Sequence, residues 1–397
     1  MNLGWQRKPL GDLCNIVNGG TPKTGVREYW AGTNLWITPA EMGRRLSPYM
    51  AHTERKLTDL GLKESSARML PPNSVILSSR APIGHLVINT KPMSTNQGCK
   101  GLVPGKQLEH KFLYYYLTSI VDLLNALGSG ATFKELSSGK LKGVTVPFPP
   151  LSEQQRIVGI LDEAFDGIAT AKANSEKNLQ NARALFESHL QSFFTQRGEG
   201  WVEKTLGELG AITSSKRIFK SEYVKSGVPF YRTKEVKELA NSRGISTELF
   251  ISEARYKEIK ANFGVPKQGD ILLTAIGTIG EIYVVEGNDD FYFKDGNVLW
   301  LKGFTTINSH FLKYVLISFV ERLNKLAHGS AYSALPIQRL NAHRIFVPSP
   351  TEQATIVSQL DSVSTETQSL GSLYERKLAA LDELKKSLLH QAFTGEL

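Results

Sequence analysis

The sequence lacks the features of a disulfide-bonded, membrane-anchored or secreted protein. Its 397 residues include only two cysteines, Cys14 and Cys99, too few for a disulfide framework or a thiolate zinc site. Apolar segments are short and interrupted by charge, as at Asp122 and Glu321, and the first residues contain no apolar run of the kind found in signal peptides. We therefore expect a cytoplasmic globular protein whose cysteines are reduced.

Motifs for nucleotide binding and for methyl transfer are also missing. No Gly-x-x-x-x-Gly-Lys-[Ser/Thr] phosphate loop occurs. The polar residue before Pro-Pro that amino-methyltransferases are expected to carry is replaced by an apolar one at Phe148–Leu151 and at Leu70–Asn73. The adjacent acids Asp289 and Asp290 are typical of a solvated turn. We expect no catalytic residue, cofactor or metal site in this chain.

Positive charge is concentrated in two blocks of the sequence. The formal net charge is +9, and residues 1–150 contain 18 Lys and Arg against 9 Asp and Glu, while residues 199–350 contain 20 against 16. Residues 151–198 and 351–397 carry a slight acidic excess. Two separate basic blocks favour a polyanion that is contacted twice, and double-stranded DNA is the partner that we expect.

The two basic blocks belong to an internal repeat with an offset of 196 to 199 residues. Ile83–Gly84 recurs as Ile279–Gly280, and the pattern of Phe112–Leu117 recurs in Phe311–Leu316. Each copy combines short β-branched runs among Gly and Pro turns with one amphipathic helix. The sequence therefore predicts an α+β protein with two tandem-duplicated domains, residues 1–150 and 199–350.

A long helix is predicted after each domain, in residues 151–198 and 351–397. Each helix begins behind a proline-rich boundary, and Ser152 with Gln155 forms a capping-box pattern in the first copy. Apolar residues follow in alternating steps of four and three, which predicts that the two helices pair as an antiparallel coiled coil. The predicted seam of these spacer helices consists of Ile157, Leu161, Ile168, Phe186, Ile356, Leu360, Leu370, Leu381 and Leu388.

Loops of both domains combine Gly, hydroxyl and amide residues with Arg or Lys. Arg and Lys pair well with guanine, Asn and Gln pair with adenine, and contacts to phosphate set position without reading sequence. The candidate DNA-binding residues of the first domain are Thr21, Lys23, Arg27, Arg44, Arg45, Ser79, Arg80, Asn96, Gln97 and Lys134. Those of the second domain are Ser214, Lys216, Arg217, Arg232, Thr233, Lys234, Asn297, Ser330 and Tyr332.

Several segments resemble the specificity subunits of Type I restriction-modification systems. The resemblance is carried by the helix entry Val146–Val158 and its weaker repeat Val347–Val357, by Leu388–Leu397, and by the turns Gly19–Pro22 and Ser79–Gly84. It implies two target-recognition domains that each read half of a bipartite DNA site, separated by the helical spacer. It further implies two methyltransferase (modification) subunits that bind S-adenosylmethionine, and restriction (motor-nuclease) subunits that use ATP and Mg2+.

The two domains are expected to read different half-sites, because the second has Thr213–Lys216 where the first has the Gly-Gly-Thr-Pro turn. Two other functions remain open. A DNA-binding module of another nucleoprotein machine would lack a neighbouring methyltransferase gene. A coiled-coil scaffold without a DNA role would show no salt-sensitive retention on duplex DNA.

Overall fold

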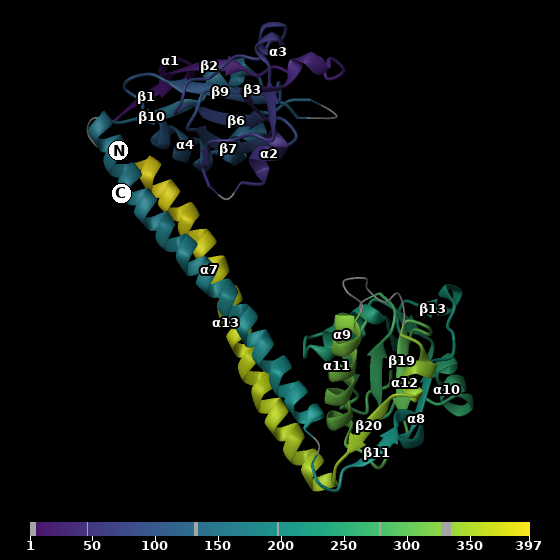
Figure 1. Cartoon of the computed structure of the whole chain (residues 1–397). Helices are drawn as coiled ribbons and strands as arrows, with labels where there is room; N and C mark the ends of the chain where they lie inside the picture. The colour runs from purple at the N-terminus through teal and green to yellow at the C-terminus, as the bar shows by residue number, and fades with distance from the viewer. Residues whose placement is uncertain (1–4, 46, 131–133, 197, 278, 327–334) are drawn as a thin grey trace. The chain divides into compact units, whose positions relative to one another are not determined.

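The chain is a mixed α and β protein that divides into two compact units (Figure 1). The computed structural model describes residues 5–45, 47–130, 134–196, 198–277, 279–326 and 335–397, apart from the side chains of residues 321–326. Unit 1 consists of Met1–Glu176 and Arg376–Leu397, and unit 2 consists of Lys177–Glu375. Each unit combines one α+β globular part with segments of both long helices. The predicted division differs, because it assigns each domain and each long helix to one consecutive segment of the chain.

Unit 1 is built on a five-stranded sheet with the order β2-β9-β6-β7-β4. The bounds of these strands are Cys14–Asn18 for β2, Cys99–Pro104 for β9, Val75–Ser79 for β6, Ile83–Asn89 for β7 and Tyr49–Met50 for β4. A three-stranded sheet contains β5 (Arg55–Leu57), β3 (Trp30–Ile37) and β8 (Met93–Thr95), and β1 (Gln6–Pro9) pairs with β10 (Thr145–Phe148). All five residues of β6 are buried, which is typical of a central strand.

Helices cover the sheets of unit 1 and connect their strands. They are α1 (Leu10–Leu13), α2 (Pro39–Gly43), α3 (Asp59–Lys63), α4 (His110–Ser119), α5 (Val121–Leu127) and α6 (Ser138–Lys142), with a 3-10 turn at Arg27–Tyr29. Glu109 caps α4 by accepting a hydrogen bond from the backbone N–H of Phe112. The amphipathic helix predicted here is interrupted at Ile120, so that it forms α4 and α5.

Unit 2 repeats this plan with strands of its own. Its central sheet has the order β12-β19-β16-β17, from Ala211–Ser214, Val298–Lys302, Ile271–Thr274 and Ile282–Val284. A second sheet contains β13 (Tyr223–Val224), β15 (Phe250–Ile251), β14 (Val228–Tyr231) and β18 (Tyr292–Phe293), and β11 (Val202–Thr205) pairs with β20 (Arg344–Val347). The helices of its globular part are α8 (Leu206–Leu209), α9 (Thr233–Ala240), α10 (Glu253–Asn262), α11 (Ser309–Leu326) and α12 (Ile337–Asn341), with a 3-10 turn at Lys220–Glu222.

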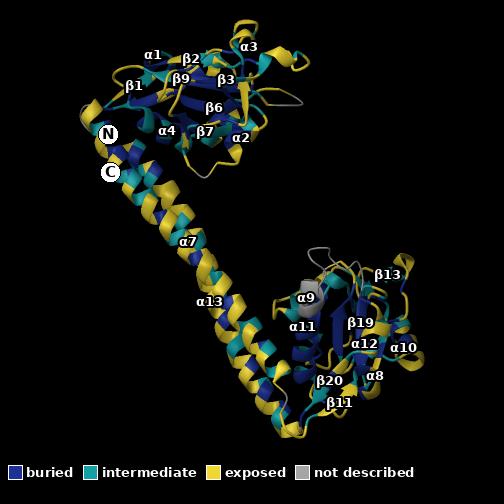
Figure 2. Ribbon diagram, in the orientation of Figure 1, coloured by how far each residue is buried: buried dark blue, intermediate teal, exposed yellow. Residues whose placement is uncertain are grey.

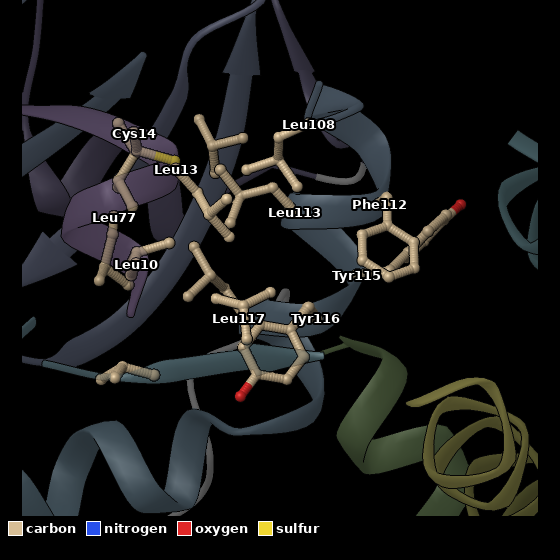
Figure 3. Packing of buried hydrophobic residues seen from close by; sticks show 14 of the residues in the cluster. Leu10, Leu13, Cys14, Leu77, Leu108, Phe112, Leu113, Tyr115, Tyr116 and Leu117 are labelled. Carbon is tan, nitrogen blue, oxygen red and sulfur yellow. The ribbon is translucent and has the colours of Figure 1, made fainter. Parts of the chain in front are cut away.

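The core of unit 1 lies between its central sheet and α4. Leu77 of β6, Leu10 of α1, and Leu113 and Leu117 of α4 belong to one buried apolar cluster (Figure 3). The cluster also contains Leu389, which lies near the end of the second long helix. That helix end is therefore part of the unit 1 core, although it is far from the other members in sequence.

The two long helices, α7 (Leu151–Thr195) and α13 (Pro350–Thr394), pack against each other in antiparallel orientation. In unit 1, Lys172 of α7 forms an ion pair with Asp382 of α13. In unit 2, Arg183 Nη2 lies 3.6 Å from Glu375 Oε1. Partners later in α7 thus meet residues earlier in α13, which confirms the predicted antiparallel pairing. Buried and exposed positions alternate along both helices, as Figure 2 shows.

Most of the predicted seam is buried between these helices or against the domains. Ile157, Leu161, Ile168, Ile356 and Leu360 are buried, and Phe186, Leu381 and Leu388 are half-buried.

Leu370 is the exception, because its side chain is 39% exposed. The seam runs from buried Thr367 to Gly371, where an added Cβ would lie 3.7 Å from Leu179 Cδ1. A step of four residues replaces the expected step of three, so that Gly371 takes the place expected for Leu370, while Leu381 and Leu388 further along the helix remain half-buried.

A buried glutamine joins each long helix to its own globular part. Gln154 Nε2 donates to the carbonyl oxygens of Pro149 (2.9 Å) and Gln107 (3.0 Å), and Gln154 Oε1 accepts from Glu109 N (2.9 Å). In unit 2, Gln353 Nε2 donates to the carbonyl of the proline at 348 (2.9 Å), and its Oε1 accepts from the backbone N–H at 308 (2.8 Å). The same side chain performs the same task in both copies.

A tyrosine and an aspartate repeat in the same way. Tyr115 of α4 donates to Asp162 of α7 at 2.5 Å, and Tyr314 of α11 donates to Asp361 of α13 at 2.5 Å. Burial raises the pKa of both tyrosines above the ordinary value, and the hydrogen bond to the carboxylate raises it further. The phenols therefore stay protonated and remain donors at neutral pH.

Candidate nucleic-acid interface

Three loops of unit 1 meet at one edge of its central sheet. Strands β2 and β6 end where the antiparallel strand β9 begins, since Asn18 pairs with Lys100 and Ser78 pairs with Cys99. The segments that follow β2 and β6 therefore lie beside the residues that precede β9. We call the predicted residues that gather there the unit 1 loop edge, and they are Thr21, Arg80, Asn96 and Gln97.

Hydrogen bonds hold the polar side chains of the unit 1 loop edge in place. Asn96 Nδ2 donates to Thr21 Oγ1 (3.3 Å), and Asn96 Oδ1 accepts from Gly98 N (2.6 Å). Thr21 Oγ1 donates to Gln97 Oε1. Thr21 and Asn96 are half-buried and Gln97 is exposed. Side chains that are oriented before the ligand arrives suit the recognition of base edges.

The Gly-Gly-Thr-Pro turn needs glycine because two backbone segments approach closely. Gly19 N donates to Cys99 O (3.1 Å), and Gly20 N donates to Thr95 O (2.8 Å). A Cβ atom on Gly19 would lie only 1.9 Å from the carbonyl oxygen of Asn96. The two glycines therefore bring the loop after β2 against the loop before β9, which places Thr21 beside Asn96.

Arg80 belongs to an ionic cluster that sequence reasoning did not identify. Glu135 Oε2 lies 3.8 Å from Arg80 Nη1, and Glu135 Oε1 lies 3.9 Å from Lys100 Nζ. Burial lowers the pKa of Lys100, and the Glu135 carboxylate opposes this shift. The stem of Arg80 packs on the Asn96 loop, since a Cβ on Gly98 would lie 3.3 Å from Arg80 Cγ. The Arg80 guanidinium is thus held by Glu135, and part of it remains exposed.

Ser79 has a structural role instead of the predicted contact with DNA. It is fully buried, and its hydroxyl donates to the carbonyl of Gly98 at 3.1 Å. Its own carbonyl accepts a hydrogen bond from Leu136 N at 2.9 Å. Ser79 therefore supports the loop that carries Arg80, and its burial corrects its prediction as a contact residue.

The other predicted cations of unit 1 lie on its surface. Arg44 Nη2 lies 2.7 Å from Glu54 Oε1, and Arg45 Nη2 donates to His52 O at 3.1 Å. The remaining predicted cations, which are also exposed, are Lys23, Arg27 and Lys134. Exposed cations of this kind suit phosphate contacts, which supply affinity and salt dependence.

Unit 2 forms a corresponding edge. Strands β12 and β16 end where β19 begins, since Ser214 pairs with Leu299 and Thr274 pairs with Val298. We call the predicted residues at this place the unit 2 loop edge, and they are Ser214, Lys216, Arg217 and Asn297.

The unit 2 loop edge is also held by hydrogen bonds and an ion pair. Arg217 Nε lies 2.7 Å from Asp295 Oδ2, and the arginine side chain is 66% exposed while the aspartate is 15% exposed. Ser214 Oγ accepts from Gly296 N at 2.9 Å. Lys216 Nζ lies 4.9 Å above the ring of the exposed Phe263. The carbonyl of Asn297 accepts from the backbone N–H at 275 (2.8 Å).

The cations predicted at the start of α9 are paired with acids. Arg232 Nη2 lies 2.8 Å from Glu235 Oε1 and 3.0 Å from Glu248 Oε2, and Lys234 lies 3.4 Å from Glu248. The hydrogen bond with Glu235 raises the pKa of Arg232 above its ordinary value. Thr233 is half-buried beside them. This group is locally balanced in charge. The predicted residues Ser330 and Tyr332 lie outside the described residues.

Strand register shows which residues of the two edges correspond. Thr21 aligns with Arg217 and Asn96 aligns with Asp295, because Asn18 and Ser214 occupy equivalent places in their sheets. Arg80 aligns with Ile276. The turn that corresponds to Gly19–Pro22 is thus Ser215–Ile218, two residues later than the sequence comparison predicted. The scaffold repeats while its edge residues differ.

Neither a metal-binding cluster nor a helix able to span a membrane is found in the described residues. No group of three or more His, Cys, Asp or Glu is placed to bind a metal ion. No helix in the described ranges is long and apolar enough to span a bilayer. Cys14 and Cys99 are both free and buried, and burial raises the pKa of each thiol to about 12.

Comparisons with known proteins agree with this architecture. Residues 2–180 and 198–374 match the family model described as "Type I restriction modification DNA specificity domain". The chain is 27% identical over 424 residues to the Type I restriction enzyme MjaIX specificity subunit of Methanocaldococcus jannaschii, with 99% of this chain and 93% of the relative covered. It is 24% identical over 361 residues to the EcoBI specificity subunit of Escherichia coli, with 82% and 74% covered.

Solved structures share the fold. A chain from a structure described as "Structural basis underlying complex assembly and conformational transition of the type I R-M system" superposes with a TM-score of 0.81 at 19% identity, with 99% and 98% of the two chains covered. The HsdS subunit from Thermoanaerobacter tengcongensis superposes with a TM-score of 0.63 at 20% identity, with 100% and 98% covered. With two family matches that together cover most of its length and follow its internal repeat, the chain belongs to the Type I restriction-modification DNA specificity family.

Proposed function

We propose that this chain is the DNA-recognition subunit of a Type I restriction-modification complex and that it reads a bipartite, asymmetric site. The observation that carries the proposal is the pair of loop edges, which repeat one scaffold but differ at corresponding positions. Thr21 beside Asn96 offers hydroxyl and amide groups, whereas Arg217 beside Asp295 offers a guanidinium and a carboxylate. Two units with the same frame and different edge chemistry suit two half-sites of different sequence.

In this proposal, partner subunits of the chain carry out the methylation and the cleavage of DNA. The membership of this chain in a family of specificity subunits supports partner methyltransferase subunits that bind S-adenosylmethionine, and restriction subunits that use ATP and Mg2+. The recognition subunit then binds the DNA site and holds the partner subunits at it. We expect the purified chain to neither methylate nor cut DNA when these cofactors are supplied.

The long helices offer a surface for the partner subunits. Leu185 of α7 and Leu370 and Leu373 of α13 are exposed by 48%, 39% and 49%. All three lie in unit 2 at a similar level of the antiparallel pair, because Arg183 of α7 pairs with Glu375 of α13. Exposed leucines on paired helices suit the docking of further apolar helices.

Co-expression with a methyltransferase subunit tests the proposed function. The complex is expressed in a host without other methyltransferases, and the methylated adenines of its genome are mapped by sequencing. The expected result is one bipartite motif with two unlike halves. A complex that methylates without any motif, or a chain whose retention on duplex DNA does not fall with salt, would contradict the proposal.

A further inference from the structure

The two loop edges each hold an arginine, but on different loops. In unit 1 the arginine is Arg80, which follows β6, and the corresponding residue of unit 2 is the exposed Ile276. In unit 2 the arginine is Arg217, which follows β12, and the corresponding residue of unit 1 is Thr21. The same scaffold therefore presents a guanidinium at two different positions.

Each of these arginines is attached to a carboxylate of its own unit. Asp295 lies 2.7 Å from Arg217 Nε, and Glu135 lies 3.8 Å from Arg80 Nη1. The side chains of Arg217 and Arg80 nevertheless remain 66% and 36% exposed. A guanidinium has five N–H donors, so that the donors not used by the carboxylate stay available to a ligand. The ion pair reduces the rotamer freedom that binding would otherwise cost.

Lys100 provides a second observation in unit 1. Its side chain is only 8% exposed, and burial of a cation is costly unless an acid pairs with it. Glu135 contacts both Lys100 and Arg80. In unit 2, Leu299 replaces Lys100 at the equivalent register position, and the arginine after the equivalent strand is absent too. The buried lysine and the arginine therefore occur together, which assigns Lys100 the task of holding Glu135 in position for Arg80.

We infer that Arg80 and Arg217 read one guanine each in the two half-sites, by hydrogen bonds to O6 and N7 in the major groove. This inference rests on the proposed function and adds to it the identity of a base. Arg is the side chain whose paired donors match guanine, and a guanidinium held in one direction suits a base edge better than a mobile phosphate contact. Because the arginines stand on different loops, the guanines occupy different positions in the two half-sites.

The test selects bound sequences from a library of random DNA duplexes with the purified full-length chain. Arg80→Ala should lower the enrichment of guanine at one position of the first half-site by about 5- to 150-fold, because a good bidentate pair is worth about 1–3 kcal/mol. The second half-site should keep its preferences. Arg217→Ala should produce the converse result, so that each variant is the matched control of the other.

Two further variants separate base reading from charge and from folding. Arg80→Lys keeps the charge but lacks the planar pair of donors, so that it should weaken the guanine preference while most of the DNA retention remains. Lys100→Met should weaken the preference at the same base as Arg80→Ala, and unchanged preferences at the other positions of the first half-site report that unit 1 is folded.

Three results would overturn the inference. The first is an equal loss of enrichment at every base in an arginine variant, which is typical of a phosphate contact. The second is unchanged enrichment at every guanine, and the third is a loss of guanine enrichment in the half-site assigned to the other arginine. If the unmodified chain selects no sequence at all, the proposed function itself is refuted.

Discussion

Replacing Gln154 with methionine tests how firmly the start of α7 is attached to its own domain. Methionine has a similar length but no amide group, so that the change removes hydrogen bonds without leaving a large cavity. Gln154 is fully buried and makes three hydrogen bonds with backbone groups. One of these partners, the carbonyl of Gln107, belongs to an exposed residue and can bond to water instead.

The expected loss of stability comes from the other two hydrogen-bond partners of Gln154, the N–H of Glu109 and the carbonyl of Pro149. The carbonyl of the buried Pro149 would lose its hydrogen bond at a cost of about 1–3 kcal/mol, and the N–H of the half-buried Glu109 would lose one at a cost of about 1 kcal/mol. We therefore expect a loss of about 2–4 kcal/mol in unfolding free energy. Gln353→Met should cost less, about 1–3 kcal/mol, because one of its two partners, the backbone N–H of the exposed Asn308, can bond to water instead.

Hydrogen exchange measured by mass spectrometry separates the two units. In Gln154→Met, peptides from α4 should exchange faster, while those from α11 keep their protection. Gln353→Met should show the reverse pattern. Gln155→Met is the control, because Gln155 is exposed and should change stability by less than about 0.5 kcal/mol. A cost below that value for Gln154→Met would refute the proposed role of the buried amide.

Three further outcomes are expected. Gly19→Ala should lower the free energy of unfolding by about 1–3 kcal/mol through overpacking. Gly25→Ala should not, because its Cβ would have no neighbour within 4 Å. Equal melting temperatures of the two variants would contradict the close approach of Gly19 to Asn96. Leu373→Asp should weaken co-purification with a methyltransferase subunit at unchanged melting temperature, and Ser372→Asp should not; unimpaired assembly would exclude this surface. A fragment of residues 1–197 should form a homodimer in sedimentation. Phe194 contacts Phe311 as Phe393 contacts Phe112, so that Phe194 of one copy can take the place of Phe393 against Phe112 of the other copy. A folded monomer would contradict this.

Local and repeated features of this protein were predictable from its sequence. The two copies, the mixed α and β composition and the antiparallel helices follow from residues that recur at an offset of 196 to 199 and from the spacing of apolar side chains. These are properties of the chain over short distances or of its self-similarity, and neither requires knowledge of the packing. The predicted seam departs from the structure at Leu370, because Gly371 faces the partner helix in its place.

The composition of the loop edges was decided by tertiary structure. Loops that are rich in polar residues were recognisable, but not which residues meet, because strand register brings Arg80 to Glu135 and Arg217 to Asp295 across 55 and 78 residues of sequence. The acids and the buried Lys100 were missed, since an isolated charge in a sequence has no visible partner. The repeated Glu-Gln at the start of both long helices was a signal for Gln154 and Gln353 that sequence reasoning used only for the family resemblance.

Burial separated residues that look alike in the sequence. Ser79 and Thr21 are both hydroxyl residues in loops with basic neighbours, yet Ser79 is fully buried and Thr21 is not. Sequence by itself determined that two similar basic domains are joined to two paired helices, because periodicity and repetition are written along the chain. Only the tertiary structure decided which side chains reach the surface at each edge, because that depends on contacts between segments that are distant in sequence.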